Sequence, residues 1–132
     1  MSVSAYKRTM RETESPRDIE RRIFSRVTAA LATYAETHDT AESEMARMQV
    51  MASSLQQALA ENIRLWSALK ADLAHPDNAL QPDLRAGLLS LALFVERQTR
   101  SVLRGEGKVA PLVSTNQMII EGLAGNPSKD AA

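Results

Sequence analysis

The sequence predicts an all-α fold, a small antiparallel helical bundle of three main helices plus a short C-terminal helix. Apolar residues recur at steps of three and four, the spacing that places them on one face of a helix. The five glycines and five prolines fall almost wholly between these periodic segments, and no run alternates in the manner of a half-buried strand. With 132 residues, 44% of them hydrophobic, we expect one domain over 1–132 with a substantial core.

The first main helix is predicted over residues 16–37. Ser15 can accept a hydrogen bond as the cap, and Pro16 suits the first helical position, where no N–H is needed. Asp18, three residues after the cap, completes an acidic version of the capping box. The expected core face consists of Ile19, Ile23, Val27, Ala30, Leu31 and Tyr34.

The second helix is predicted over residues 40–74 as one continuous rod about 50 Å long, at 1.5 Å per residue. Its apolar stripe comprises Met45, Met48, Ala52, Leu55, Leu59, Ile63, Trp66 and Leu73, with Met51 and Leu69 at one border. Asn62 falls within this stripe. It either fixes the register by a hydrogen bond across the interface or lies at the edge of the stripe, and the second interpretation is favoured.

A turn is predicted between the second and third helices. His75 precedes Pro76 and should end the helix, and Pro82 begins the third helix, predicted over 82–104. The core stripe of the third helix is Leu84, Leu88, Leu91, Val95, Thr99 and Val102. Leu89 and Leu93 project from nearly the opposite side and Phe94 from a flank, so this helix should be covered on two sides. Trp66 is expected to be a core residue against the returning third helix.

The end of the chain is predicted to hold a fourth helix over residues 111–123, after a flexible joint at 105–108 that contains two glycines. The tail, 124–132, is expected to be disordered. At the other end, residues 1–14 are either a mobile N-terminal segment or a short amphipathic turn. The apolar residues of that turn would be Val3, Tyr6 and Met10.

The composition argues against catalysis. The chain has no cysteine, and neither His38 nor His75 has a partner at metal-ligand spacing, so both are interpreted as solvated loop residues. No phosphate-loop or hydrolase motif occurs. We therefore expect no enzyme activity, no cofactor, no bound metal and no small-molecule substrate.

Charge and hydropathy indicate which classes of binding partner to expect. Sixteen basic residues balance sixteen acidic ones, which argues against a nucleic-acid partner or an anionic membrane. The densest basic group is Arg17, Arg21, Arg22 and Arg26. Acidic residues interrupt it and no aromatic platform accompanies it, so it is interpreted as a solvated face, with an RNA site as the alternative. Neither a signal peptide nor a membrane span is expected.

Three blocks of sequence resemble the FlaF family of flagellar biosynthesis regulators from alphaproteobacteria. They are AYKRTMRETESPRDIERRIF, then NIRLWSALKADLAHPDNALQPDLRAGLLSLALFVERQT, and finally PLVSTNQMIIEGL. The resemblance implies a cytoplasmic protein that binds flagellin as an export chaperone and so promotes its synthesis and secretion. The alternative that it implies is a post-transcriptional regulator acting on flagellin mRNA or through a regulator such as FlbT.

A hypothetical client groove follows from the surplus apolar side of the third helix. It would comprise Leu89, Leu93 and Phe94 together with the Trp66 and Leu69 end of the second helix, and the fourth helix would cover it until a client displaced that helix. Met48 and Met51 are further candidates, because methionine side chains adapt to irregular partners, although core packing is the favoured interpretation of both. A third interpretation makes the surplus surface a homodimer interface.

Overall fold

The computed structural model describes residues 16–123, and these residues form helices joined by short loops, with no strand among them. The elements are α2 (Pro16–Asp39), α3 (Glu44–Val50), the π-helical turn η1 (Met51–Leu55), α4 (Gln56–Ala74), α5 (Pro82–Leu103) and α6 (Ala110–Leu123). The predicted all-α class is confirmed. No helix within 16–123 combines the length and the hydropathy needed to cross a bilayer. The expectations for 1–14 and for the tail lie outside the described residues.

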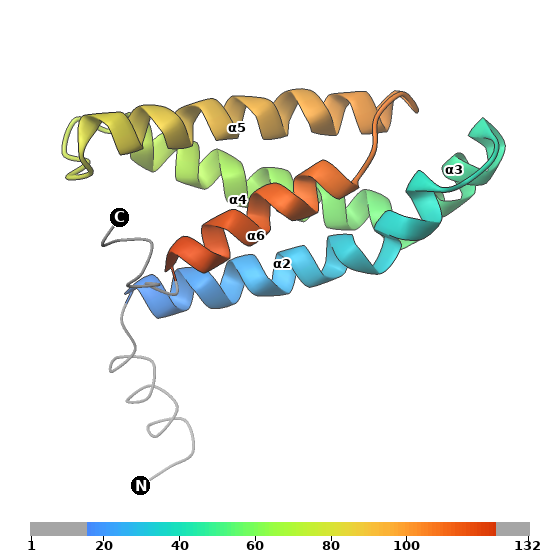
Figure 1. Cartoon of the computed structure of the whole chain (residues 1–132), viewed down its shortest axis with the longest axis horizontal. Helices are drawn as coiled ribbons and strands as arrows, with labels where there is room; N and C mark the ends of the chain where they lie inside the picture. Colours follow the sequence, from blue (N-terminus) through green and yellow to red (C-terminus); the bar gives the residue numbers. More distant parts are fainter. Residues whose placement is uncertain (1–15, 124–132) are drawn as a thin grey trace, which may run out of the picture.

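The helices pack as two pairs (Figure 1). α4 and α5 form an antiparallel hairpin, and α6 lies along α2, its most extensive neighbour. α2 also contacts α4, whereas α5 contacts α4 and α6 but not α2 within the described part of the chain. The core lies where the two pairs meet, and its largest fully buried side chain is that of Trp66.

The core face of α2 differs from the predicted one. Phe24, Val27 and Leu31 are buried, but Ile23 lies at the border and is exposed. The aromatic ring of Phe24 takes the core position because it packs against Trp66, a contact that periodicity alone cannot reveal. α2 also continues two residues beyond the predicted end, so His38 is a buried residue of the last helical turn and not a solvated loop residue.

The predicted continuous helix 40–74 is wrong, because it is divided into three parts. α3 begins only at Glu44, after Ser43, whose Oγ accepts a hydrogen bond from the Ala46 N–H at 3.1 Å. The helix is then interrupted at Ser53, where φ is −75° and ψ is −140°. The Ser53 hydroxyl donates a hydrogen bond to the Val50 carbonyl. This bond gives the carbonyl a side-chain partner, which competes with the regular backbone hydrogen bonds of a helix. Regular α-helix resumes at Gln56.

The turn between α4 and α5 is fixed by two polar side chains. The Asn78 side chain donates to the Asp72 carbonyl at 3.1 Å, and Arg85 of α5 donates to the carbonyls of Leu73 and His75. These bonds satisfy carbonyls that the end of a helix leaves without partners. The hairpin is therefore closed at this end by residues from both helices.

The joint before α6, predicted to be flexible, is held firmly. The N–H groups of Glu106 and Gly107 both donate to the Ser101 carbonyl, and the Gln98 side chain donates to the Lys108 carbonyl at 2.9 Å. Gly105 has φ of +80°, which glycine adopts without steric cost. This loop is a tight connection that fixes the start of α6.

Candidate functional site

Burial along the core face of α5 falls steadily toward the N-terminus of that helix. Val102 and Val95 are fully buried, Leu91 and Leu88 are half-buried, and Leu84 is 50% exposed. All five side chains share one face of the helix, because their spacing matches the helical repeat. The apolar stripe therefore continues beyond the point at which neighbouring helices cover it.

Burial also decreases along α6, in this case toward the C-terminus of the helix. Leu112 and Asn116 are fully buried, whereas Ile119, Ile120 and Leu123 are only half-buried. Since α6 ends where α5 begins, both helices lose their cover at the same end of the molecule (Figure 1). Leu69, near the end of α4, is half-buried as well.

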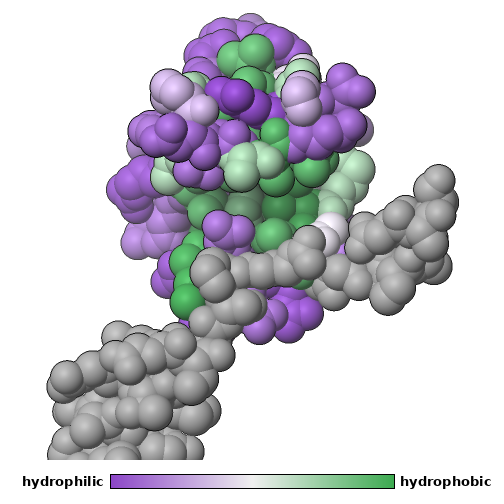
Figure 2. All heavy atoms as spheres, turned by 90° about the vertical axis from the view of Figure 1, so that its left-hand side faces the viewer, coloured by the Kyte–Doolittle hydropathy of each residue, from purple (hydrophilic) through white to green (hydrophobic). Residues whose placement is uncertain are grey.

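These residues line an apolar hollow between diverging helices. α5 and α6 are close at the loop that joins them and separate toward their other ends, with α4 behind them (Figure 1). The view onto this end shows hydrophobic atoms recessed below a hydrophilic surface (Figure 2). We call the region the end hollow and define it by Leu69, Leu84, Leu88, Leu91, Ile119 and Leu123.

A buried polar network lies below the end hollow. The Trp66 indole N–H donates to Asn116 Oδ1 at 2.8 Å, and Asn116 Nδ2 donates to Asn62 Oδ1 at 2.8 Å. The Trp66 ring meets the Phe24 ring edge to face, with centroids 5.7 Å apart. The network therefore joins α4 to α6. The interpretation of Asn62 as an edge residue is wrong, because it is 0% exposed and bonds across the interface.

The N-terminus of α6 is fixed by the last residue of α2. The Asp39 carboxylate accepts hydrogen bonds from the N–H groups of Val109 at 2.8 Å and Ala110 at 2.9 Å. The buried His38 donates from Nδ1 to Asp39 Oδ1 at 2.7 Å, which orients the carboxylate. A side chain about 70 positions away along the chain thus performs the role of a helix cap. Negative charge is also favourable at this end of the helix dipole.

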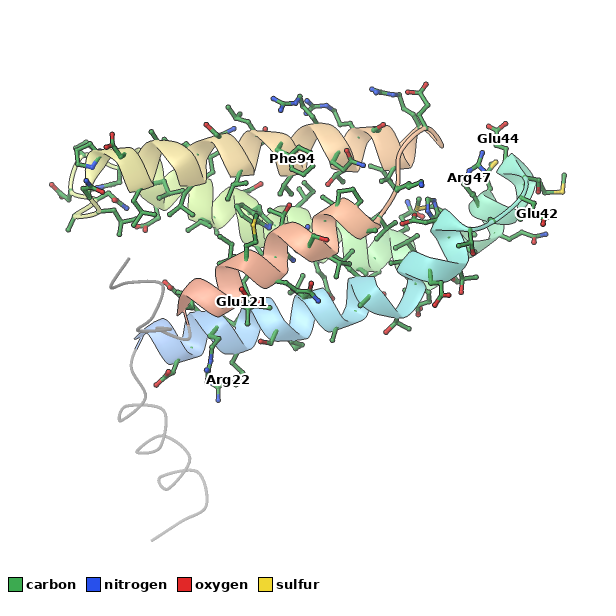
Figure 3. The ribbon with its side chains drawn as sticks, viewed as in Figure 1. Arg22, Glu42, Glu44, Arg47, Phe94 and Glu121 are labelled. Carbon is green, nitrogen blue, oxygen red and sulfur yellow. The ribbon has the colours of Figure 1, made fainter. Side chains whose placement is uncertain are left out.

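The structure does not bring all the predicted groove residues onto one surface. Phe94 is half-buried on the side of α5 that faces α6 (Figure 3). Leu93 is 45% exposed and lies on the side of α5 away from the core, with Leu89 beside it and half-buried. Trp66 is 1% exposed beneath α6, so a client could reach it only if α6 moved.

The methionine candidates lie far from the end hollow. Met48 is exposed on α3, and Met51 is half-buried in η1. Both line a pocket of about 150 Å³ with Arg47, Leu103 and Arg104, near the opposite end of the bundle. Figure 3 places α3, with the labelled Glu44 and Arg47, at that end. Met48 and Met51 therefore cannot share a surface with Leu69.

The periodicity assigns Leu84, Leu88 and Leu91 to the core, but Leu84 is exposed and Leu88 and Leu91 are only half-buried. It did not identify Asn116 as a partner of Trp66 either. One feature of the sequence does indicate that Leu84 lies at an edge. The apolar stripe of α5 extends into the first turn of the helix, directly after a segment that contains two prolines. A core residue so close to a helix start often lies at the rim of a bundle.

No group of three or more His, Cys, Asp and Glu side chains within residues 16–123 could hold a metal ion. The family model described as flagellar protein FlaF matches residues 2–123. No curated protein and no solved structure matches the chain.

Proposed function

The chain belongs to the FlaF family of flagellar proteins, and on this basis we propose that it binds flagellin in the cytoplasm as an export chaperone. Holding flagellin in a soluble, unassembled form would promote both its synthesis and its secretion. The proposal combines the family membership with the chemistry of one surface, the end hollow.

The observation that carries the proposal is the exposed continuation of the core. In the end hollow, α4, α5 and α6 present leucine and isoleucine side chains. Other residues of 16–123 cover these side chains only partly. Contiguous apolar surface of this kind marks an interaction site or an aggregation hazard. The apolar row from Leu84 to Leu91 is about 10 Å long, at 1.5 Å per residue, which equals two turns of a client helix. An amphipathic helix from flagellin would fit by its apolar face.

In this proposal the client lies beside α6 and does not displace it. Val109 just before α6, and Leu112 and Asn116 within it, are fully buried, and hydrogen bonds attach the helix at its start and its middle. Removing α6 would expose the Trp66 ring to solvent and break the hydrogen bond from its N–H to Asn116. Docking next to α6 requires neither change, so the client covers surface that is already accessible.

Two leucines of α5 provide the test, because they have similar exposure on opposite sides of one helix. Leu84 lies in the end hollow and Leu93 on the outer side. The chain would be co-expressed with flagellin and the mixture separated by size-exclusion chromatography. We expect co-elution for the native chain and for Leu93→Glu, and loss of co-elution for Leu84→Glu, because a buried unpaired carboxylate is costly.

Circular dichroism of both variants would establish that they remain helical. If Leu93→Glu abolished binding and Leu84→Glu did not, the outer groove predicted from the sequence would be the site and the end hollow would be rejected. If the native chain did not co-elute with flagellin at all, the chaperone proposal itself would fail.

A further inference from the structure

A small pocket lies between α3 and the end of α5, at the end of the bundle opposite the end hollow. α3 packs on α2 and η1, but its backbone does not approach α5 within the described part of the chain. The pocket has a volume of about 150 Å³, and residues of both helices line it. We call it the methionine slot and define it by His38, Arg47, Met48, Met51, Leu103 and Arg104.

The methionine slot has a closed inner wall and an open mouth. His38 and its neighbour in the wall, Val102, are fully buried, so they form the inner wall. Met48 is 63% exposed and Leu103 is 53% exposed, so these two side chains lie at the mouth. A ligand can therefore enter the slot from solvent without displacing a helix.

α3 contributes no buried residue to the fold, and it exposes Met45 as well as Met48. Methionine side chains adapt to irregular partners, and exposed apolar surface often marks an interaction site. The π-helical turn η1 follows α3 directly, with Met51 as its first residue. Such turns occur frequently at functional sites. The pocket, the exposed methionines and the irregular turn thus coincide at one place.

The volume of the slot limits the class of ligand. An apolar cavity of about 150 Å³ can hold a benzene molecule. Sites for drug-sized molecules and cofactors are larger, at about 300 Å³ or more. The methionine slot therefore suits one phenyl- or leucine-sized side chain.

Two arginines give the slot hydrogen-bond donors that the fold leaves unused. Arg47 donates one hydrogen bond, to the Ala41 carbonyl at 3.4 Å, and Arg104 donates one to Glu106 at 3.4 Å. The other N–H groups of both guanidinium groups have no partner within 16–123. A ligand that presents a carboxylate or carbonyl oxygen beside its apolar group would satisfy them.

Acidic residues offset part of the positive charge. Glu44 belongs to the wall of the slot, and Glu106 pairs with Arg104 between two largely exposed side chains. Asp39 is engaged with His38 and with the start of α6. Glu42, exposed before α3, lies outside the wall (Figure 3). The preference for a carboxylate over a neutral group should therefore be modest.

We propose that the methionine slot is a second protein-binding site, which takes one bulky apolar side chain from a peptide segment of a partner. Carboxylate or carbonyl oxygens beside that side chain accept hydrogen bonds from Arg47 and Arg104. Because the slot and the end hollow lie at opposite ends of the bundle, both can be occupied at once. The slot does not depend on flagellin being the client of the end hollow.

A titration of the full-length chain, labelled with ¹³C at its methionine methyl groups, tests the proposal. The probe is N-acetylphenylalanine, which carries a phenyl ring and a carboxylate. We expect saturable shifts of the Met48 and Met51 signals, with a dissociation constant on the order of 1 mM for a ligand of this size. The signal of Met118, which is exposed on α6 outside the slot, should not move.

Two related compounds separate the apolar and the polar contributions. N-acetylphenylalanine amide replaces the carboxylate by a neutral group, so it should bind about threefold more weakly. N-acetylglycine keeps the carboxylate but lacks the phenyl ring, so it should not shift the Met48 and Met51 signals.

Variants at exposed positions test the site without disturbing the core. Met48→Glu should weaken binding of N-acetylphenylalanine by at least about tenfold, measured at Met51, because it places a carboxylate in the apolar mouth. Met45→Glu is the matched control, since Met45 is exposed on the same helix but is not part of the wall. Arg104→Gln should remove most of the preference for the acid over the amide, whereas Arg97→Gln, exposed on α5 outside the slot, should keep it.

Shifts that do not saturate, or equal shifts at Met118, would overturn the proposal, because both indicate non-specific contact. An equal loss of binding in Met45→Glu and Met48→Glu would overturn it as well. Met48 and Met51 signals that move on dilution of the chain alone would assign the slot to a second copy of the chain and not to a partner. If the probe binds the slot but flagellin does not bind the chain, the proposed function fails while the second site stands.

Discussion

The side-chain amide of Asn116 on α6 donates a hydrogen bond to Asn62 on α4 at 2.8 Å, with both residues fully buried. Asn116 also accepts from the Trp66 indole, so one residue satisfies two partners on the facing helix. Asn62 Nδ2 has no hydrogen-bond partner among the described residues. Replacing each of the two asparagines should therefore lower the free energy of unfolding by a different amount.

Replacing Asn116 by alanine should destabilise the protein more than replacing Asn62. The Asn116→Ala change leaves the Trp66 N–H and Asn62 Oδ1 buried without partners, at a cost of about 3 kcal/mol. Asn62→Ala leaves the Asn116 Nδ2 donor without a partner, but it also removes the unsatisfied Nδ2 donor of Asn62 itself. We therefore expect a loss of stability of about 1 kcal/mol. Urea denaturation followed by the fluorescence of the only tryptophan would measure both. Gln117→Ala, on the exposed side of α6, is the control.

The Asp39 carboxylate should stabilise α6 from outside that helix. Asp39→Ala removes the acceptor for the Val109 and Ala110 N–H groups, and loss of a helix cap costs about 1 to 2 kcal/mol. Hydrogen exchange should accelerate in the first turns of α6, with Glu36→Ala as the control, since Glu36 is exposed on the same helix. Unchanged exchange at 109–113 in Asp39→Ala would contradict the capping role.

Two glycines, one in a loop and one inside a helix, should respond oppositely to alanine. A Cβ at Gly107 would lie 2.8 Å from Ser101 Oγ and 2.9 Å from Ser101 Cβ, so Gly107→Ala must distort the α5–α6 loop. At Gly87, inside α5, a Cβ meets nothing within 4 Å. We expect Gly107→Ala to lower the melting temperature, and Gly87→Ala to stabilise by about 0.5 to 1 kcal/mol through helix propensity. A stabilised Gly107→Ala would show that the loop is looser than its hydrogen bonds indicate.

Several helix ends could be predicted from the sequence because their signals are local. Pro16 and Pro82 begin α2 and α5 as predicted, and α4 ends at Ala74, two residues before Pro76. The interruption at Ser53 has no such signal, since serine occurs within ordinary helices and only its bond to the Val50 carbonyl distinguishes it.

The candidate site was less predictable, because it depends on partners that are distant in sequence. His38 and Asn62 were misinterpreted because Asp39 is engaged with the start of α6 and Asn116 lies 54 positions from Asn62. The end hollow results from the divergence of α5 and α6. Periodicity assigns Leu84 to a core face, but it cannot tell whether another helix reaches that position.

Flagellin binding should weaken when α6 is loosened, if α6 is a fixed wall of the end hollow. Asp39→Ala and Asn116→Ala each remove hydrogen bonds that hold α6 in place. Ile119 and Leu123 of α6 would then line the end hollow for a smaller fraction of the time. The apparent affinity of a site falls with the fraction that is competent, so we expect a decrease of about two- to tenfold. Titration calorimetry at a temperature where both variants remain folded would measure it.

Displacement of α6 by the client, as the sequence alone suggested, requires the opposite result. Weaker attachment would then make displacement easier, and both variants would bind flagellin more tightly than the native chain. Glu36→Ala and Gln117→Ala again serve as controls, because they alter the same helices at exposed positions. The sign of the change in affinity therefore separates a client that docks beside α6 from one that replaces it.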